Sequence, residues 1–121
     1  MKADFSVQTE EMRKMNAEEI RKMGALTEII KSHGDFAYGI NKPEDIAIEW
    51  DDWDFTPEQV DAWLSARCFT PEAAHDLAEY NITPAQAGKM TELGGYRDTV
   101  GYQYANDNIT LDEAIEEVEK V

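Results

Sequence analysis

The sequence has one cysteine, two histidines and few basic residues. Because Cys68 is alone, an internal disulfide and a cysteine-based zinc site are both excluded. His33 and His75 belong to no metal-binding spacing such as HExxH. Only 11 Lys and Arg residues stand against 26 Asp and Glu residues, which gives a net charge of −15. We therefore expect a protein that repels nucleic acid and anionic membranes and attracts basic protein surfaces.

Long apolar runs are also missing. No stretch approaches the roughly 20 residues that cross a bilayer, and the first thirty residues lack the apolar segment and cleavage site of a signal peptide. We therefore expect a soluble cytoplasmic protein without membrane contact. The 121 residues are 42% hydrophobic, which is enough for one compact domain with a buried core.

The negative charge is unevenly distributed along the chain. Residues 1–42 hold seven basic and seven acidic side chains, whereas residues 43–121 hold 19 acidic side chains and four basic ones. This asymmetry divides the compact domain into a charge-neutral N-terminal helical segment (1–40) and an acidic region (41–121).

Three similar segments follow one another in the acidic region: FTPEQVDAWLSARC, FTPEAAHDLAEYN and ITPAQAGKMTELG. In the first, Pro57 suits the first position of a helix, so Thr56 becomes its N-cap. Gln59 completes a capping box, and Phe55 and Val60 can form a hydrophobic staple across the helix start. Each segment therefore predicts one short, well-capped helix.

The helix starts recur every 13 to 14 residues. The start position is occupied in turn by Pro43, Pro57, Pro71, Pro84, Arg97 and Leu111. Three residues before the later starts lie Asp54, Cys68, Asn81, Gly94 and Asn108, where Asn and Gly suit the left-handed residue that ends a helix. Five or six short helices of this kind must bury their apolar positions against one another. These positions are Phe55, Val60, Trp63, Phe69, Ala74, Leu77, Ile82, Ala87, Met90, Ile109 and Ala114.

A longer helix precedes the repeats. Asn16 and Glu19 form a capping box, apolar residues follow at helical spacing, and Gly34 ends the pattern, which predicts a helix over 17–33. Residues 36–40 could form a short strand, while residues 46–50 fit better into a helix that begins at Pro43. The predicted fold is all-α: a long N-terminal helix followed by a compact stack of short helices in tandem repeats.

The residues that could act in catalysis or metal binding do not support either function. Cys68 and His75 are seven residues apart, whereas a nucleophile and its base need hydrogen-bond contact. Cys68 also takes the place of Asp54 and Asn81 in the repeats, which indicates a turn residue. The acidic run EWDDWD has no D-x-D-x-D-G calcium-loop pattern. We therefore expect a protein that is not an enzyme and needs no cofactor or metal.

The acidic side chains of the repeats are interleaved with tryptophans. Trp63 occupies a core position, while Trp50 and Trp53 could be either buried or exposed as anchors for a partner. A net charge of −15 matches the phosphates of roughly seven or eight base pairs of duplex DNA. The predicted partner-binding residues are Glu44, Asp45, Glu49, Trp50, Asp51, Asp52, Trp53, Asp54, Glu58 and Asp61.

In size, acidity and predicted helical makeup the chain resembles the small acidic DNA mimics of phages and mobile elements, which include anti-restriction and anti-CRISPR proteins. The resemblance implies that carboxylates imitate phosphates, here Glu49, Asp51, Asp52, Asp54, Glu58 and Asp61. It further implies a non-enzymatic inhibitor that occupies the basic nucleic-acid site of a nuclease or defence complex without itself binding nucleic acid.

A second interpretation remains open. Residues 90–118 resemble the second half of a ubiquitin-associated three-helix domain, with LGGY in the place of its Met-Gly-Phe/Tyr loop and Asn108 opening the last helix. Leu93 departs from the methionine of that loop. This resemblance implies an adaptor that binds partners through apolar grooves. In the N-terminal segment, balanced charge with Met12, Met15 and Met23 favours core packing or a homodimer through the N-terminal helix.

Overall fold

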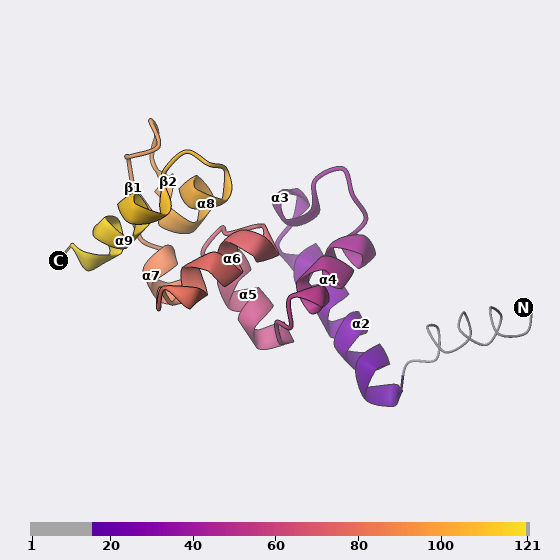
Figure 1. Cartoon of the computed structure of the whole chain (residues 1–121). Coiled ribbons are helices and arrows are strands. Elements are labelled where there is room, and N and C mark those ends of the chain that lie inside the picture. Colours follow the sequence, from indigo (N-terminus) through magenta and orange to yellow (C-terminus); the bar gives the residue numbers. More distant parts are fainter. Residues whose placement is uncertain (1–15, 121) are drawn as a thin grey trace, which may run out of the picture.

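The computed structural model describes residues 16–120 and is mostly helical (Figure 1). Its helices are α2 (Ala17–Ser32), α3 (Asp35–Tyr38), α4 (Pro43–Asp52), α5 (Pro57–Ser65), α6 (Pro71–Glu79), α7 (Pro84–Ala87), α8 (Val100–Ala105) and α9 (Leu111–Glu119). Strands β1 (Met90–Thr91) and β2 (Asp98–Thr99) pair antiparallel. The all-α prediction is confirmed, with six short helices in the region from residue 41 onward. This hairpin of two short strands was not predicted.

The long helix α2 begins as predicted. The Asn16 side chain accepts from the Glu19 amide at 2.8 Å, and the Glu19 carboxylate accepts from the Asn16 amide at 3.4 Å. The helix ends at Ser32, one residue earlier than predicted, and Gly34 follows with φ of 83°. Residues 36–40 contain the end of the single-turn helix α3 instead of a strand.

Threonine side chains cap most of the repeat helices. Thr56, Thr83 and Thr110 each form a complete capping box with a Gln or Glu three residues later. Thr70 precedes α6 without a side-chain cap bond, and Ala73 at the third helical position has no side chain that could return a bond to the Thr70 amide. Five of the six predicted helix starts are therefore correct: Pro43, Pro57, Pro71, Pro84 and Leu111. The last helix is capped by Thr110 and begins at Leu111 as the repeat spacing predicts, and not at Asn108 as the resemblance to a ubiquitin-associated domain implied.

The helix ends share one geometry, which explains the period of the sequence. At four ends a residue other than glycine adopts φ between 60° and 65°, and the next amide bonds to the carbonyl five residues back, as in a Schellman motif. The amide–carbonyl pairs are Phe55–Trp50, Cys68–Trp63, Ile82–Leu77 and Asn108–Gln103. The carbonyl residues are 13, 14 and 26 residues apart, so the period reflects short helices that end in Schellman turns after α4, α5, α6 and α8.

The predicted left-handed positions are only partly right. Asp54 and Asn81 have positive φ as expected, but at the other two ends the left-handed residues are Arg67 and Asp107 instead of Cys68 and Asn108. The connections after α5 and α8 are one residue longer than those after α4 and α6, so the turn lies one residue further from the next helix. At Gly94 the positive φ belongs to the neighbouring Gly95.

The repeat pattern is interrupted after α7. That helix is only four residues long, and the hairpin of β1 and β2 follows it. Helix α8 therefore begins at Val100, capped by Thr99, and not at Arg97 as the spacing predicted. Met90 was expected in the core, but it lies on β1 with 42% of its surface exposed.

The core follows the length of the stack. Helix α2 packs against α4 and α5, and α8 packs against α6, α7 and α9. The remaining predicted core positions are buried, except that Phe69 is partly exposed at the edge of the core. Met23 packs partly buried against this core, whereas Met12 and Met15 lie outside the described residues. None of the described helices has the length and apolar character to span a bilayer.

Candidate interaction surface

The carboxylates predicted to bind a partner lie on α4, α5 and the turn between them. Asp51 is half-buried, and the other seven are exposed. Glu44, Asp45 and Glu58 occupy the first turns of their helices, where negative charge is favoured by the helix dipole. Glu72 on α6 and Asp112 on α9 repeat this placement. Exposed negative charge therefore recurs along the chain at the helix starts.

Few of these charges are neutralised. Asp51 forms an ion pair with Lys22 of α2 at 2.6 Å, and Asp61 accepts from His33 at 2.8 Å. Within residues 16–120, three of the 19 carboxylates from residue 43 onward lie within 4 Å of a Lys or Arg nitrogen; these are Asp51, Asp98 and Glu117. The N-terminal segment thus compensates only a small part of the acidic surface.

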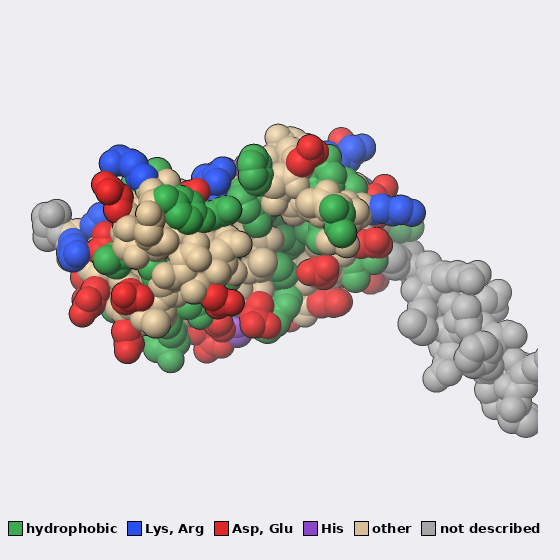
Figure 2. All heavy atoms as spheres, turned by 90° about the horizontal axis from the view of Figure 1, so that it is seen from above, with side chains coloured by type: hydrophobic (Ala, Val, Ile, Leu, Met, Phe, Trp, Pro, Cys, Tyr) green, Lys and Arg blue, Asp and Glu red, His purple; other side chains and the backbone are tan. Residues whose placement is uncertain are grey.

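Figure 2 shows how the charges are distributed on one face of the molecule. Most acidic side chains follow its lower long edge, while Lys and Arg side chains lie mainly along the opposite edge and at the two ends. The area between the edges is largely uncharged. On this face, negative charge is therefore concentrated along one edge of the stack.

The two tryptophans of the acidic run have different environments. Trp50 is fully buried and packs edge-to-face on Phe55 with ring centroids 5.0 Å apart, so its assignment to the partner-binding set is wrong. Trp50 accepts the bond from the Phe55 amide that closes the Schellman turn, and side chains at these two positions commonly pack together. This contact places Trp50 in the core. Trp53 is 38% exposed, and its ring lies 4.8 Å from that of His75. Trp53 is therefore the tryptophan available to a partner.

The two residues considered for catalysis are held in other contacts. Cys68 is fully buried, and burial raises the pKa of its thiol to about 12. His75 lies against Trp53, with its Nε2 atom 3.4 Å from the Glu79 carboxylate. Among residues 16–120, no three His, Cys, Asp or Glu side chains converge in a way that could hold a metal ion.

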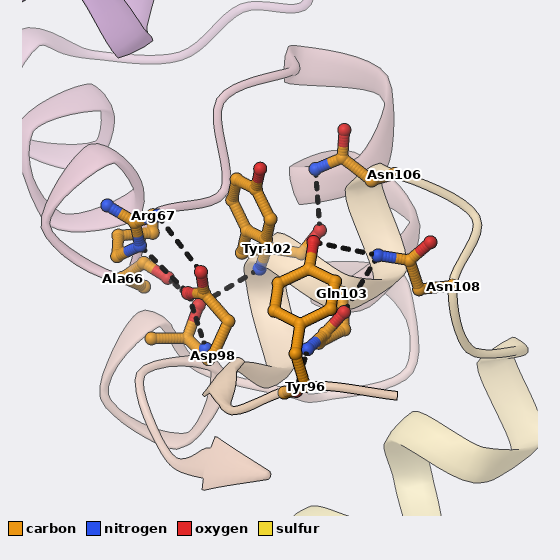
Figure 3. Close-up of polar contacts among 9 residues, drawn as sticks. Ala66, Arg67, Tyr96, Asp98, Tyr102, Gln103, Asn106 and Asn108 are labelled. Atoms are coloured by element: carbon orange, nitrogen blue, oxygen red, sulfur yellow. Dashed lines mark hydrogen bonds and ion pairs between the residues drawn. The ribbon is translucent and has the colours of Figure 1, made fainter. Parts of the chain in front are cut away.

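A cluster around Arg67 was not found from the sequence. Its Nε and Nη2 atoms donate to the two carboxylate oxygens of Asp98 at 2.8 and 3.0 Å (Figure 3). The guanidinium carbon also lies 4.8 Å from the ring centroid of Tyr102, 5.4 Å from that of Phe36 and 5.6 Å from that of Phe69. The signal in the sequence is that Arg67 stands where the other Schellman turns have Asp or Asn. The cluster joins α3, the α5–α6 connection, β2 and α8.

The hydrogen bonds with Asp98 change the pKa of both groups. The hydrogen bonds that Arg67 donates to Asp98 raise the pKa of Arg67. Burial alone would raise the pKa of Asp98, but the hydrogen bonds from Arg67 and from the Thr99 amide outweigh burial and hold it below its ordinary value. Both groups are therefore charged over the whole physiological range.

A second polar network is built around the fully buried Gln103 (Figure 3). Its Nε2 atom donates to the Tyr96 carbonyl at 2.7 Å, and its Oε1 atom accepts from Asn108 at 2.8 Å. Asn108 also lies 3.2 Å from the Tyr96 hydroxyl. The LGGY segment belongs to the connection between β1 and β2, so it lies within a hairpin and not between two helices.

No protein family matches the sequence, and neither a curated protein nor a solved structure matches the chain.

Proposed function

We propose that the protein is a non-enzymatic inhibitor that presents an acidic, DNA-mimicking surface to the basic nucleic-acid site of a nuclease or defence complex. The observation that carries the proposal is the excess of exposed carboxylates on α4 and α5 that have no Lys or Arg partner among the described residues. Carboxylates fixed on helices can replace phosphates in a cationic groove without being substrates.

The placement of these charges supports a defined binding surface. Asp52 and Asp54 flank the exposed Trp53, and Glu49 lies one helical turn before them on α4. Aromatic side chains beside charged groups are frequent anchors of protein interfaces. We infer that Trp53 packs on the partner while the carboxylates around it pair with Lys and Arg side chains.

The experiment begins with capture from the native host. The immobilised chain is incubated with lysate at low salt, and bound protein is eluted with duplex DNA or with salt. The captured partner is then purified, and displacement of labelled DNA from it is followed by fluorescence anisotropy. We expect the chain to displace the DNA, with an affinity that falls steeply as salt increases. Affinity indifferent to salt, or a stable complex of partner, DNA and chain together, would overturn the proposal.

Two variants that each neutralise four carboxylates distinguish binding through a local surface from an effect of net charge. The first combines Glu49→Gln, Asp52→Asn, Asp54→Asn and Glu58→Gln on α4 and α5. The control combines Glu92→Gln, Asp112→Asn, Glu116→Gln and Glu119→Gln, which are equally exposed and lie near the C-terminal end. We expect the first variant to displace DNA at least about tenfold more weakly and the control to lose much less.

The alternative is a helical interaction module, such as a ubiquitin-associated-like adaptor, that binds through apolar surface. Exposed apolar side chains favour it, among them Phe36 at 68% and Tyr96 at 49% exposure. This alternative predicts that the first charge variant binds its partner as well as the native chain does. It also predicts that Trp53→Ala weakens binding at every salt concentration.

A further inference from the structure

An open groove of about 450 Å³ lies between α2 and α4. It is lined by Met23, Gly24, Thr27 and Glu28 of α2 and by Glu44 and Ile48 of α4. Ile48 is 50% exposed, and Ile20, which precedes Gly24 by one helical turn, is 58% exposed. Exposed apolar side chains around a groove in an otherwise charged surface are typical of an interaction site.

Gly24 forms part of this groove, and nothing within residues 16–120 requires a glycine there. It lies within the 16-residue helix α2 and is not among the residues with positive φ. A Cβ atom at Gly24 would meet nothing within 4 Å among the residues that the structure describes. Glycine inside a helix costs about 1 kcal/mol relative to alanine. The absent side chain instead lets an external group approach the backbone of α2 closely.

The charges around the groove indicate what kind of molecule can fill it. Glu28 is paired with Lys31 at 3.6 Å, whereas Glu44 has no Lys or Arg partner within residues 16–120. The chain as a whole carries a net charge of −15, which disfavours a second copy and favours a cationic segment as the occupant. The occupant should therefore combine an apolar face with Lys or Arg at its edge.

We propose that the groove between α2 and α4 binds an amphipathic cationic helix of a partner protein. Its apolar side chains lie over Gly24 between Ile20 and Ile48, and a basic side chain reaches Glu44. A helix that docks in a groove carries its apolar anchors at spacings of three and four residues on one face. The proposal does not depend on DNA mimicry, because it uses the apolar groove instead of the carboxylates from Glu49 to Asp61.

The test uses the full chain and two synthetic peptides of about 18 residues, a length sufficient for a helix. One carries leucines on a single helical face and lysines elsewhere; the other has the same composition in shuffled order. Gly24→Gln fills the groove, and Ala25→Gln is the matched control, because Ala25 is exposed but does not line the groove. Calorimetry measures the binding of both peptides to the native chain and to both variants.

We expect the amphipathic peptide to bind the native chain and Ala25→Gln equally and Gly24→Gln at least about tenfold more weakly. The shuffled peptide should bind weakly, with no difference among the three proteins. Equal binding of the two peptides by the native chain, or full affinity in Gly24→Gln, would refute the proposal. A native dimer that Gly24→Gln converts to a monomer would show that a second copy fills the groove, which also refutes it.

The folded state of the key variant is checked independently. Glutamine is a better helix former than glycine, and the space at Gly24 is open, so Gly24→Gln should unfold at the native temperature or above it. Weaker peptide binding together with undiminished thermal stability then reports on the groove and not on the fold.

Discussion

The guanidinium of Arg67 and the carboxylate of Asp98 form a two-point ion pair between segments 31 residues apart in the sequence. Arg67 makes this contact from a left-handed backbone conformation, with φ of 62°. An arginine in that conformation is strained, whereas Asn or Gly tolerates it. The ion pair and the surrounding rings therefore hold the α5–α6 connection in place at a backbone position that would otherwise favour another residue.

Replacing two left-handed residues by glycine should have different effects. Asn81→Gly keeps the Schellman turn and should leave the free energy of unfolding within about 0.5 kcal/mol of the native value. Arg67→Gly also relieves the backbone, but it leaves Asp98 without its partner and removes three cation–π contacts, so we expect a loss of about 2 kcal/mol. Urea unfolding followed by circular dichroism measures both. If both variants were equally stable, the cluster would contribute nothing.

Acid should remove the contribution of Asp98. Its pKa in the folded state is below the ordinary value of 3.8, so the folded state favours the ionised form. The resulting stabilisation is complete above pH of about 4 and is lost as the pH falls through the lowered pKa. We expect Asp98→Asn to be less stable than the native chain at pH 7 and to show a shallower decline of stability below pH 4. Urea titrations at successive pH values test this; parallel curves for the two proteins would contradict it.

The regular part of this fold could be predicted from the sequence because its signals are local. A threonine, a proline and a Gln or Glu within four residues define a helix start, and the apolar side chains of the repeats show which positions are buried. The hairpin could not be predicted in this way. It depends on contacts between residues far apart in the chain, such as the bond from the Thr99 hydroxyl to the Ala66 carbonyl at 2.6 Å.

The candidate surface was predictable in composition but not in detail. The sequence identifies the carboxylates of α4 and α5, and most of them are exposed. Neighbouring tryptophans cannot be told apart from composition, because burial depends on position within the turn: Trp50 precedes the Schellman turn and is buried, while Trp53 lies within it and is exposed. The groove at Gly24 was also missed, since only the arrangement of α2 and α4 leaves that space open.

Gly94 should be intolerant of a side chain although its φ is not positive. A Cβ atom there would lie 2.9 Å from the Asn108 Cβ atom and closer still to the carboxamide of Gln103. Gly94→Ala must therefore displace the buried network, at a cost of about 1 to 3 kcal/mol.

Gln103→Ala removes the group that clashes but also leaves the Tyr96 carbonyl without its donor. We expect the double variant to lose less stability than the sum of the two single variants, which urea unfolding of all four proteins measures. Strict additivity would contradict the proposed clash.

Cys68 should react with thiol reagents only after the chain unfolds. The side chain is fully buried beside Gly101, where a Cβ atom would lie 3.0 Å from that of Cys68, and burial raises the pKa of the thiol to about 12. Because the thiolate is the reactive form, both the low thiolate fraction at pH 8 and the closed surroundings slow the reaction. We expect labelling by a disulfide reagent to be at least about 100-fold slower in the native chain than in urea, where the thiol has its ordinary pKa. Arg67→Gly provides a graded test, because it loosens the residue next to Cys68 and should accelerate labelling about tenfold for each 1.4 kcal/mol of stability lost. Rapid labelling of the native chain would mean that the α5–α6 connection opens readily. The conclusion that the Arg67 cluster holds this connection in place would then be wrong.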